Sequence, residues 1–161
     1  MLFTERLTIA PLALPDSGFM LELLNTEGWL KFIGDRHVHS SEDAENYIQR
    51  IADNLDYHCF VCRRREDDTP AGVITLIKRK YLEHHDIGFA FLPAYTKQGY
   101  AHEAAGRLLN ELVNTGEHKK IAAITLKDNV SSIRLLEKLG FVLEKEITEN
   151  DEDLFMYIKE L

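Results

Sequence analysis

The spacing of apolar residues predicts a short strand followed by one long amphipathic helix. The strand is IGFAFL, residues 87–92, and Pro93 ends it. After a turn at 97–100, apolar residues recur at intervals of three and four, as on one helix face. They are Ala101, Ala104, Ala105, Leu108, Leu109, Leu112 and Val113. A glycine turn that opens a helix leaves backbone N–H groups unpaired at the positive end of the helix dipole. The turn is therefore predicted to bind an anion such as phosphate.

The segments before this helix are predicted to form a strand, several helical turns and three more strands. Alternating residues at 6–11 indicate the opening strand, and helical spacing follows at 15–24 and at 41–55. Residues 25–28 are expected to interrupt the first helical stretch. Strands at 57–64, 71–78 and 87–92, joined by polar turns, are typical of an antiparallel meander.

The segments after the long helix complete a parallel unit and a hairpin. An apolar strand at 120–126 follows the helix, so strands 87–92 and 120–126 are predicted to be parallel. Asn129 caps a short helix that ends at Gly140. Strands at 141–147 and 154–161 follow. The expected fold is one mixed α/β (α+β) domain over residues 1–161, with a mostly antiparallel sheet of about seven strands around a central βαβ unit.

Charge and hydropathy exclude some classes of protein. The net charge is −8 over 161 residues, which argues against a nucleic-acid-binding face. It is compatible with a cationic substrate such as an amine, although a soluble surface explains it equally well. No apolar run approaches the roughly 20 residues that span a bilayer, and the N-terminus lacks the pattern of a signal peptide. A cytoplasmic location without membrane contact is expected; the oligomeric state is unreadable, and a homodimer is compatible with the sequence.

Neither the cysteines nor the histidines predict a metal site. Cys59 and Cys62 form a C-x-x-C pattern, but they fall within a predicted strand. Residues three apart on a strand face opposite sides, so two reduced structural thiols are expected. The pair His37 and His39, and the run from His84 to Asp86, lack the further ligands of a zinc site.

Four local motifs, in this order, resemble the GCN5-related N-acetyltransferase (GNAT) family. They are DIGF at 86–89, QGYAHEA at 98–104, NVSS at 129–132 and EKLGF at 137–141. The opening TERL at 4–7 resembles the branch that includes the ribosomal-protein N-terminal acetyltransferases. The resemblance covers essentially the whole chain and implies transfer of an acetyl group from acetyl-CoA to an amine, without a metal.

The resemblance also implies where acetyl-CoA binds. Backbone N–H groups of the turn would hold the pyrophosphate, the strand at 87–92 would lend backbone groups to the pantetheine, and a strand N–H would stabilise the oxyanion. The implied contacts are Phe89, Ala90, Phe91, Lys97, Gln98, Gly99, Tyr100, Ala101, Asn129 and Ser132.

The chain departs from the family pattern at two positions. Leu136 replaces the tyrosine that many members use to protonate the leaving thiolate, so Ser132 is the candidate donor. Thr96 stands where the turn usually opens with Arg or Gln, which predicts weaker phosphate binding. Asp86 matches the family's acidic position on the central strand, and His85 lies at the mouth of that strand, so these two residues are the candidate bases. Adjacent strand residues face opposite ways, so only one of His84 and His85 can face the cleft.

The expected function is an acyl-CoA-dependent N-acetyltransferase that acts on a protein N-terminal amine or a small-molecule amine. A non-catalytic acyl-CoA-binding module of the same fold is the alternative. A dinucleotide-binding domain is disfavoured, because the turn lacks G-x-G-x-x-G.

Overall fold

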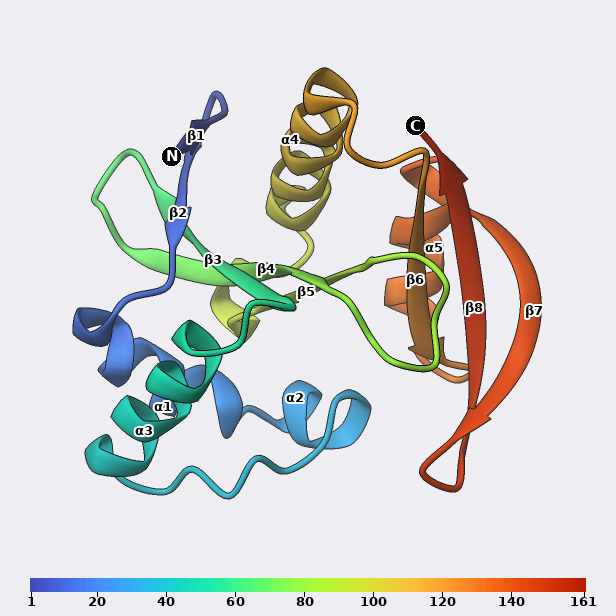
Figure 1. The fold of residues 1–161 in the computed structure, drawn as a ribbon. Coiled ribbons are helices and arrows are strands. Elements are labelled where there is room, and N and C mark those ends of the chain that lie inside the picture. The colour runs from blue at the N-terminus through green and yellow to red at the C-terminus, as the bar shows by residue number, and fades with distance from the viewer.

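The computed structural model describes residues 1–161 and contains one eight-stranded sheet with the order β1-β2-β3-β4-β5-β6-β8-β7 (Figure 1). All neighbouring strands are antiparallel except β5 and β6. The prediction of a mostly antiparallel sheet is confirmed, with one strand more than expected. The strands are β1 (Leu2–Phe3), β2 (Leu7–Pro11), β3 (Tyr57–Arg64), β4 (Pro70–Ile77), β5 (Asp86–Phe91), β6 (Lys120–Leu126), β7 (Val142–Glu149) and β8 (Glu152–Glu160).

The helices follow the predicted pattern with one correction. The expected interruption at residues 25–28 is confirmed at Asn25 and Thr26 but ends earlier than predicted, because the Thr26 side chain caps a new helix from Glu27 by accepting a hydrogen bond from the Trp29 N–H. The helices are η1 (Leu14–Asp16), α1 (Ser17–Leu24), α2 (Glu27–Phe32), α3 (Ser41–Ala52), η2 (Pro93–Tyr95), α4 (Tyr100–Thr115) and α5 (Val130–Lys138).

Each face of the sheet has its own hydrophobic core. One core joins α1, α2 and α3 to side chains such as Cys59 and Val73. The other joins α4 and α5 to side chains such as Cys62 and Ile87. The two cysteines are free thiols on opposite faces, as predicted, and burial raises the pKa of Cys59 to about 12. Both thiols are therefore structural side chains.

The parallel strands β5 and β6 meet at one residue pair and then separate (Figure 1). Asp86 is in register with Ala122, whose N–H donates to the His85 carbonyl oxygen over 2.9 Å. On their other edges β5 pairs with β4 along its whole length and β6 pairs with β8. Beyond Asp86, the edge of β5 that faces β6 is thus left without a strand partner.

No helix in the structure combines the length and the apolar character that crossing a membrane requires.

A substitution of Leu136 tests whether the buried side chains of α5 anchor this helix to the core. The side chain is 1% exposed and belongs to the core beneath α4. Leu136→Ala is expected to lower the free energy of unfolding in urea by about 2–5 kcal/mol, because it leaves a cavity. Leu55→Ala is the matched control, since Leu55 is 89% exposed, and should change it by no more than about 0.5 kcal/mol. Equal effects of the two substitutions would contradict this packing.

Candidate functional site

The turn that precedes α4 carries a run of unpaired backbone donors. The first hydrogen bond at this end of the helix runs from the Glu103 N–H to the Gly99 carbonyl oxygen over 3.0 Å. The N–H groups of residues 97–102 donate to no backbone or side-chain acceptor of the chain. Gly99 is the N-cap and has no side chain to occupy them. These donors therefore point to an anion-binding site at the positive end of the helix dipole.

The backbone conformation of the turn is unusual. Lys97 has a φ of 59° and Gly99 a φ of 84°, whereas the φ of Gln98 is negative. Left-handed φ values are uncommon for residues other than glycine. Residues of opposite hand in succession aim neighbouring N–H groups to the same side of the chain, which forms a nest for anions. The strain at Lys97 is thus concentrated where the unpaired donors lie.

The side chains of the turn brace it from within. The Gln98 amide nitrogen donates to the Ala94 carbonyl oxygen over 2.7 Å, and the Thr96 hydroxyl donates to that of Pro93 over 2.9 Å. The Tyr100 side chain is buried in the core, while Lys97 is exposed. Thr96 therefore stabilises η2. Lys97 adds positive charge, and the backbone of the turn presents the hydrogen-bond donors.

An arginine from the N-terminus completes the turn, and sequence reasoning missed it. Arg6 donates from Nη1 to the Gln98 carbonyl oxygen over 2.9 Å and forms an ion pair with Glu103 at 2.7 Å. The Glu103 carboxylate accepts hydrogen bonds from Arg6 and Thr4. The TERL motif contained Arg6, but nothing in its spacing signalled a partner 97 residues away.

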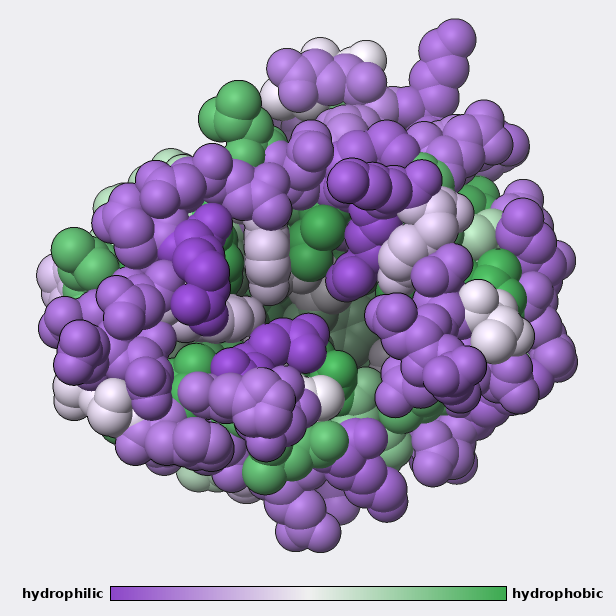
Figure 2. Space-filling view, turned by 60° about the horizontal axis from the view of Figure 1, so that its bottom comes forward, coloured by the Kyte–Doolittle hydropathy of each residue, from purple (hydrophilic) through white to green (hydrophobic).

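The open edge of β5 presents the backbone of alternate residues. The Leu92 N–H, just past the end of β5, donates to the carbonyl oxygen of Ala71 in β4 over 2.9 Å. Backbone groups that face one neighbour alternate along a strand, so Ala90 also faces β4 whereas Phe89 and Phe91 face the gap. Figure 2 shows that the molecule is hollowed near the centre of the side that carries α2 and α3, with hydrophobic residues in its depth.

The start of α5 brings Asn129 and Ser132 together. The Asn129 side-chain oxygen accepts from the Ser132 backbone N–H over 3.3 Å, so this oxygen serves as the helix cap. Ser132 is half-buried and its hydroxyl is not the capping group. Leu136, one turn later on the same side, is buried in the core. The family's tyrosine position is therefore filled by a packing residue.

The candidate bases Asp86 and His85 have different partners. Asp86, the first residue of β5, is buried and accepts from Arg79 Nε over 2.7 Å. Burial raises the pKa of the Asp86 carboxyl, and the Arg79 guanidinium opposes this rise. His85, just before β5, meets His118 with ring centroids 4.6 Å apart, and burial together with His118 lowers its pKa. The structure thus brings Asp86 together with Arg79, whereas His85 contacts His118.

His84 and the start of β6 border a cavity of about 220 Å³. Its wall is formed by Tyr81, Leu82, Glu83, His84, Lys120, Ala122, Glu144, Lys145, Met156 and Ile158. Ala122 is also the register partner of Asp86, so this cavity adjoins the point at which β5 and β6 separate.

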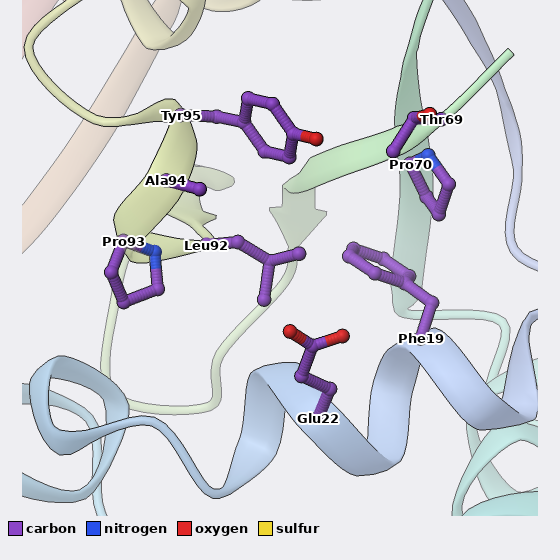
Figure 3. Close-up of a pocket in the computed structure, with 8 residues that line it drawn as sticks. All are labelled: Phe19, Glu22, Thr69, Pro70, Leu92, Pro93, Ala94 and Tyr95. Atoms are coloured by element: carbon purple, nitrogen blue, oxygen red, sulfur yellow. The ribbon is translucent and has the colours of Figure 1, made fainter. Parts of the chain in front are cut away.

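A larger cavity of about 570 Å³ lies between α1 and η2 (Figure 3). The Glu22 carboxylate points into it, with Phe19 and Leu92 beside it. Tyr95 lines the side that leads to the turn. This cavity lies at the far end of β5 from Asp86 and is separate from the gap between β5 and β6.

The metal-ligating side chains that come together are Asp35, His37 and His39. One ligand atom from each lies within 4.8 Å of the others, and all three residues are exposed. Asp35 also accepts from the His37 backbone N–H over 2.7 Å. Two imidazoles and a carboxylate suit a divalent transition metal. The run from His84 to Asp86 forms no such group, because neighbouring strand side chains point apart.

Comparisons with known proteins agree with the geometry. A model described as an acetyltransferase (GNAT) domain matches residues 6–142. The uncharacterised N-acetyltransferase YnaD of Bacillus subtilis is 28% identical over 138 residues, which cover 85% of this chain and 79% of YnaD.

Two solved structures share the fold at low sequence identity. RimL, a ribosomal L7/L12 α-N-protein acetyltransferase in complex with coenzyme A, is 16% identical with a TM-score of 0.84, over 98% of this chain and 96% of RimL. Spermidine N-acetyltransferase from Vibrio cholerae, in complex with CoA and spermine, is 19% identical with a TM-score of 0.81, over 98% and 96% of the chains. Since the family model covers most of the sequence, the chain belongs to the GNAT family and is an N-acetyltransferase.

Proposed function

We propose that this N-acetyltransferase transfers an acetyl group from acetyl-CoA directly to an amine, without an acyl-enzyme intermediate. The observation that carries the proposal is the run of unpaired N–H groups at residues 97–102, next to the open edge of β5. The turn supplies donors for a pyrophosphate, and the strand edge supplies donors and acceptors for an extended pantetheine. Acetyl-CoA contains both of these groups in sequence.

Backbone groups form most of the proposed cofactor site. The N–H groups from Gln98 to Ala101 hold the pyrophosphate, with added charge from Lys97. Pantetheine lies along β5 like an added strand and pairs with Phe89 and Phe91. The Asn129 amide nitrogen donates to the same arm, since its oxygen already caps α5.

The proposed chemistry needs one hydrogen-bond donor to the oxyanion, one proton acceptor and one hydrogen-bond donor to the leaving sulfur. The amine nitrogen attacks the acetyl carbonyl carbon, and the Phe89 N–H stabilises the oxyanion that forms. We assign the oxyanion to Phe89 rather than Ala90, because the Ala90 backbone faces β4. The tetrahedral intermediate then collapses, with the C–S bond breaking as the C=O bond re-forms.

Proton transfers complete the reaction. Asp86 accepts the amine proton, through water where the distance requires it, and its raised pKa makes it a stronger base than an ordinary carboxylate. The Ser132 hydroxyl donates a hydrogen bond to the departing CoA thiolate and keeps its proton, and the released thiolate takes up a proton from solvent. His85 takes no part in this scheme, because its ring packs against His118 and its pKa is lowered by burial.

The acceptor belongs to the class of primary amines. RimL acts on a protein α-amino group and the Vibrio enzyme on spermidine, and both share this fold. A net charge of −8 attracts cationic amines of either kind.

An amine panel tests the proposal. Acetyl-CoA and the protein are incubated with N-terminal peptides, polyamines, amino acids and aminoglycosides, and free CoA is measured with a thiol reagent. At least one amine is expected to raise thiol release above the rate without an amine, with the acetylated product seen by mass spectrometry. Thiol release that no amine increases would contradict the proposed transfer.

Gly99→Val tests the phosphate-binding turn. A side chain at Gly99 would lie 3.3 Å from Arg6 and would strain a left-handed residue, so CoA binding should be lost. Gly116→Val is the matched control at the other end of α4, where φ is +66° and no atom lies within 4 Å. Both variants should lose about 1–2 kcal/mol of stability. Only Gly99→Val should lose CoA binding by calorimetry; normal binding by this variant would refute the assignment.

Ser132→Ala tests the hydrogen bond to the leaving sulfur. Loss of a donor that acts on charge developing in the transition state is expected to lower kcat by on the order of 10²-fold with little change in KM for acetyl-CoA. Ser131→Ala is the control, because Ser131 is the exposed neighbour on the same helix. If the two variants turn over at the same rate as the unmodified protein, Ser132 is not the thiolate partner.

A further inference from the structure

The N-terminal segment that joins β1 to β2 is built into the anion-binding turn. Arg6 contacts the turn at the Gln98 carbonyl oxygen, 2.9 Å from Nη1, and its guanidinium lies 4.3 Å from the centre of the Tyr100 ring. The same guanidinium donates from Nε to Glu103 in the first turn of α4 over 2.7 Å. One side chain therefore joins both sides of the turn.

The segment is held firmly enough to act as a support. The Glu103 carboxylate also accepts from the Arg6 backbone N–H over 2.9 Å and from the Thr4 hydroxyl. The Arg6 carbonyl oxygen accepts from the Arg65 N–H of the segment after β3 over 2.8 Å. Partial burial of the Glu103 carboxyl acts to raise its pKa, but the hydrogen bonds from Thr4 and Arg6 outweigh this effect and lower the pKa. The ion pair is therefore complete at neutral pH.

Peptide geometry gives this contact a specific consequence. In a trans peptide the C=O and the following N–H point in opposite directions. Because Arg6 holds the Gln98 carbonyl oxygen, the Gly99 N–H is directed away from Arg6, to the open side of the turn. Glycine at this position would otherwise allow the peptide to rotate.

We propose that Arg6 and Glu103 act as positioning residues for the CoA pyrophosphate, by fixing the peptide between Gln98 and Gly99 with its N–H toward the ligand. Arg6 also neutralises the Glu103 carboxylate, which would otherwise repel the phosphates. This inference rests on the proposed function and extends the site to a segment 97 residues away in sequence.

The prediction is a loss of affinity confined to ligands with a pyrophosphate. Arg6→Met and Glu103→Gln should each weaken CoA binding by about tenfold or more, because a hydrogen bond to a charged group is removed. The affinity for pantetheine, which lacks the pyrophosphate, should stay within about twofold of that of the unmodified protein. A change of this size is expected of a surface substitution that removes no contact to the ligand. Arg6→Lys should not restore CoA affinity, since an ammonium cannot hold both acceptors in the geometry of a guanidinium fork.

Each variant is first checked for an unfolding transition like that of the unmodified protein. It is then titrated with CoA and with pantetheine, and binding is followed through the backbone amide signals by NMR. Arg107→Met is the matched control, because Arg107 pairs with Glu111 over 2.9 Å on the same helix but away from the turn. Unchanged CoA affinity in Arg6→Met, full affinity in Arg6→Lys, or an equal loss for CoA and pantetheine would overturn the proposal. Failure of the unmodified chain to bind CoA would instead overturn the proposed function, and this positioning role with it.

Discussion

Unsatisfied backbone hydrogen-bonding groups are the constraint on which the site depends. A chain can leave peptide groups unpaired only where water or a ligand satisfies them. Here this occurs at the turn of residues 97–102 and at the edge of β5 beyond Asp86. The first follows from a helix that begins at a glycine N-cap, and the second from the separation of β5 from β6 after a single register pair. The proposed cofactor site is thus made mainly by the main chain.

Charge around the turn is arranged locally, against the charge of the whole protein. The net charge of −8 would repel an anionic cofactor, and Glu103 lies in the first turn of α4. Arg6 neutralises that carboxylate at 2.7 Å, and Lys97 is exposed on the turn. The remaining acidic surface is free to attract an amine. Acetyl-CoA is anionic and the amine is cationic, so a surface with a locally neutralised turn and an acidic remainder suits both substrates.

Periodicity predicted most of the fold, because burial on one face leaves a direct trace in the sequence. The helix α4, the cap at Asn129 and the strands of the meander all lie close to their expected places. The short strand β1 was missed, since two residues carry no period. The start of α2 was missed because a threonine cap outweighed the turn tendency of the residues around it.

The site was predictable where local motifs set the backbone, and not where distant segments meet. Gly99 indicated the turn, because glycine readily adopts the left-handed conformation that the turn requires. Arg6 gave no such signal, because its partners lie on α4 and the turn. Likewise the pairing of Asp86 with Arg79 depends on how the loop before β5 folds back. Alternation along a strand did predict that Cys59 and Cys62 lie on opposite faces of the sheet.

The most direct test of the account is a titration of the isotope-labelled protein with CoA, observed through backbone amide NMR signals. The account predicts that the largest shifts occur at the amides of residues 97–102 and at Phe89 and Phe91, while Ala90 shifts less. Saturable binding that shifts other amides and leaves residues 97–102 unperturbed would contradict it.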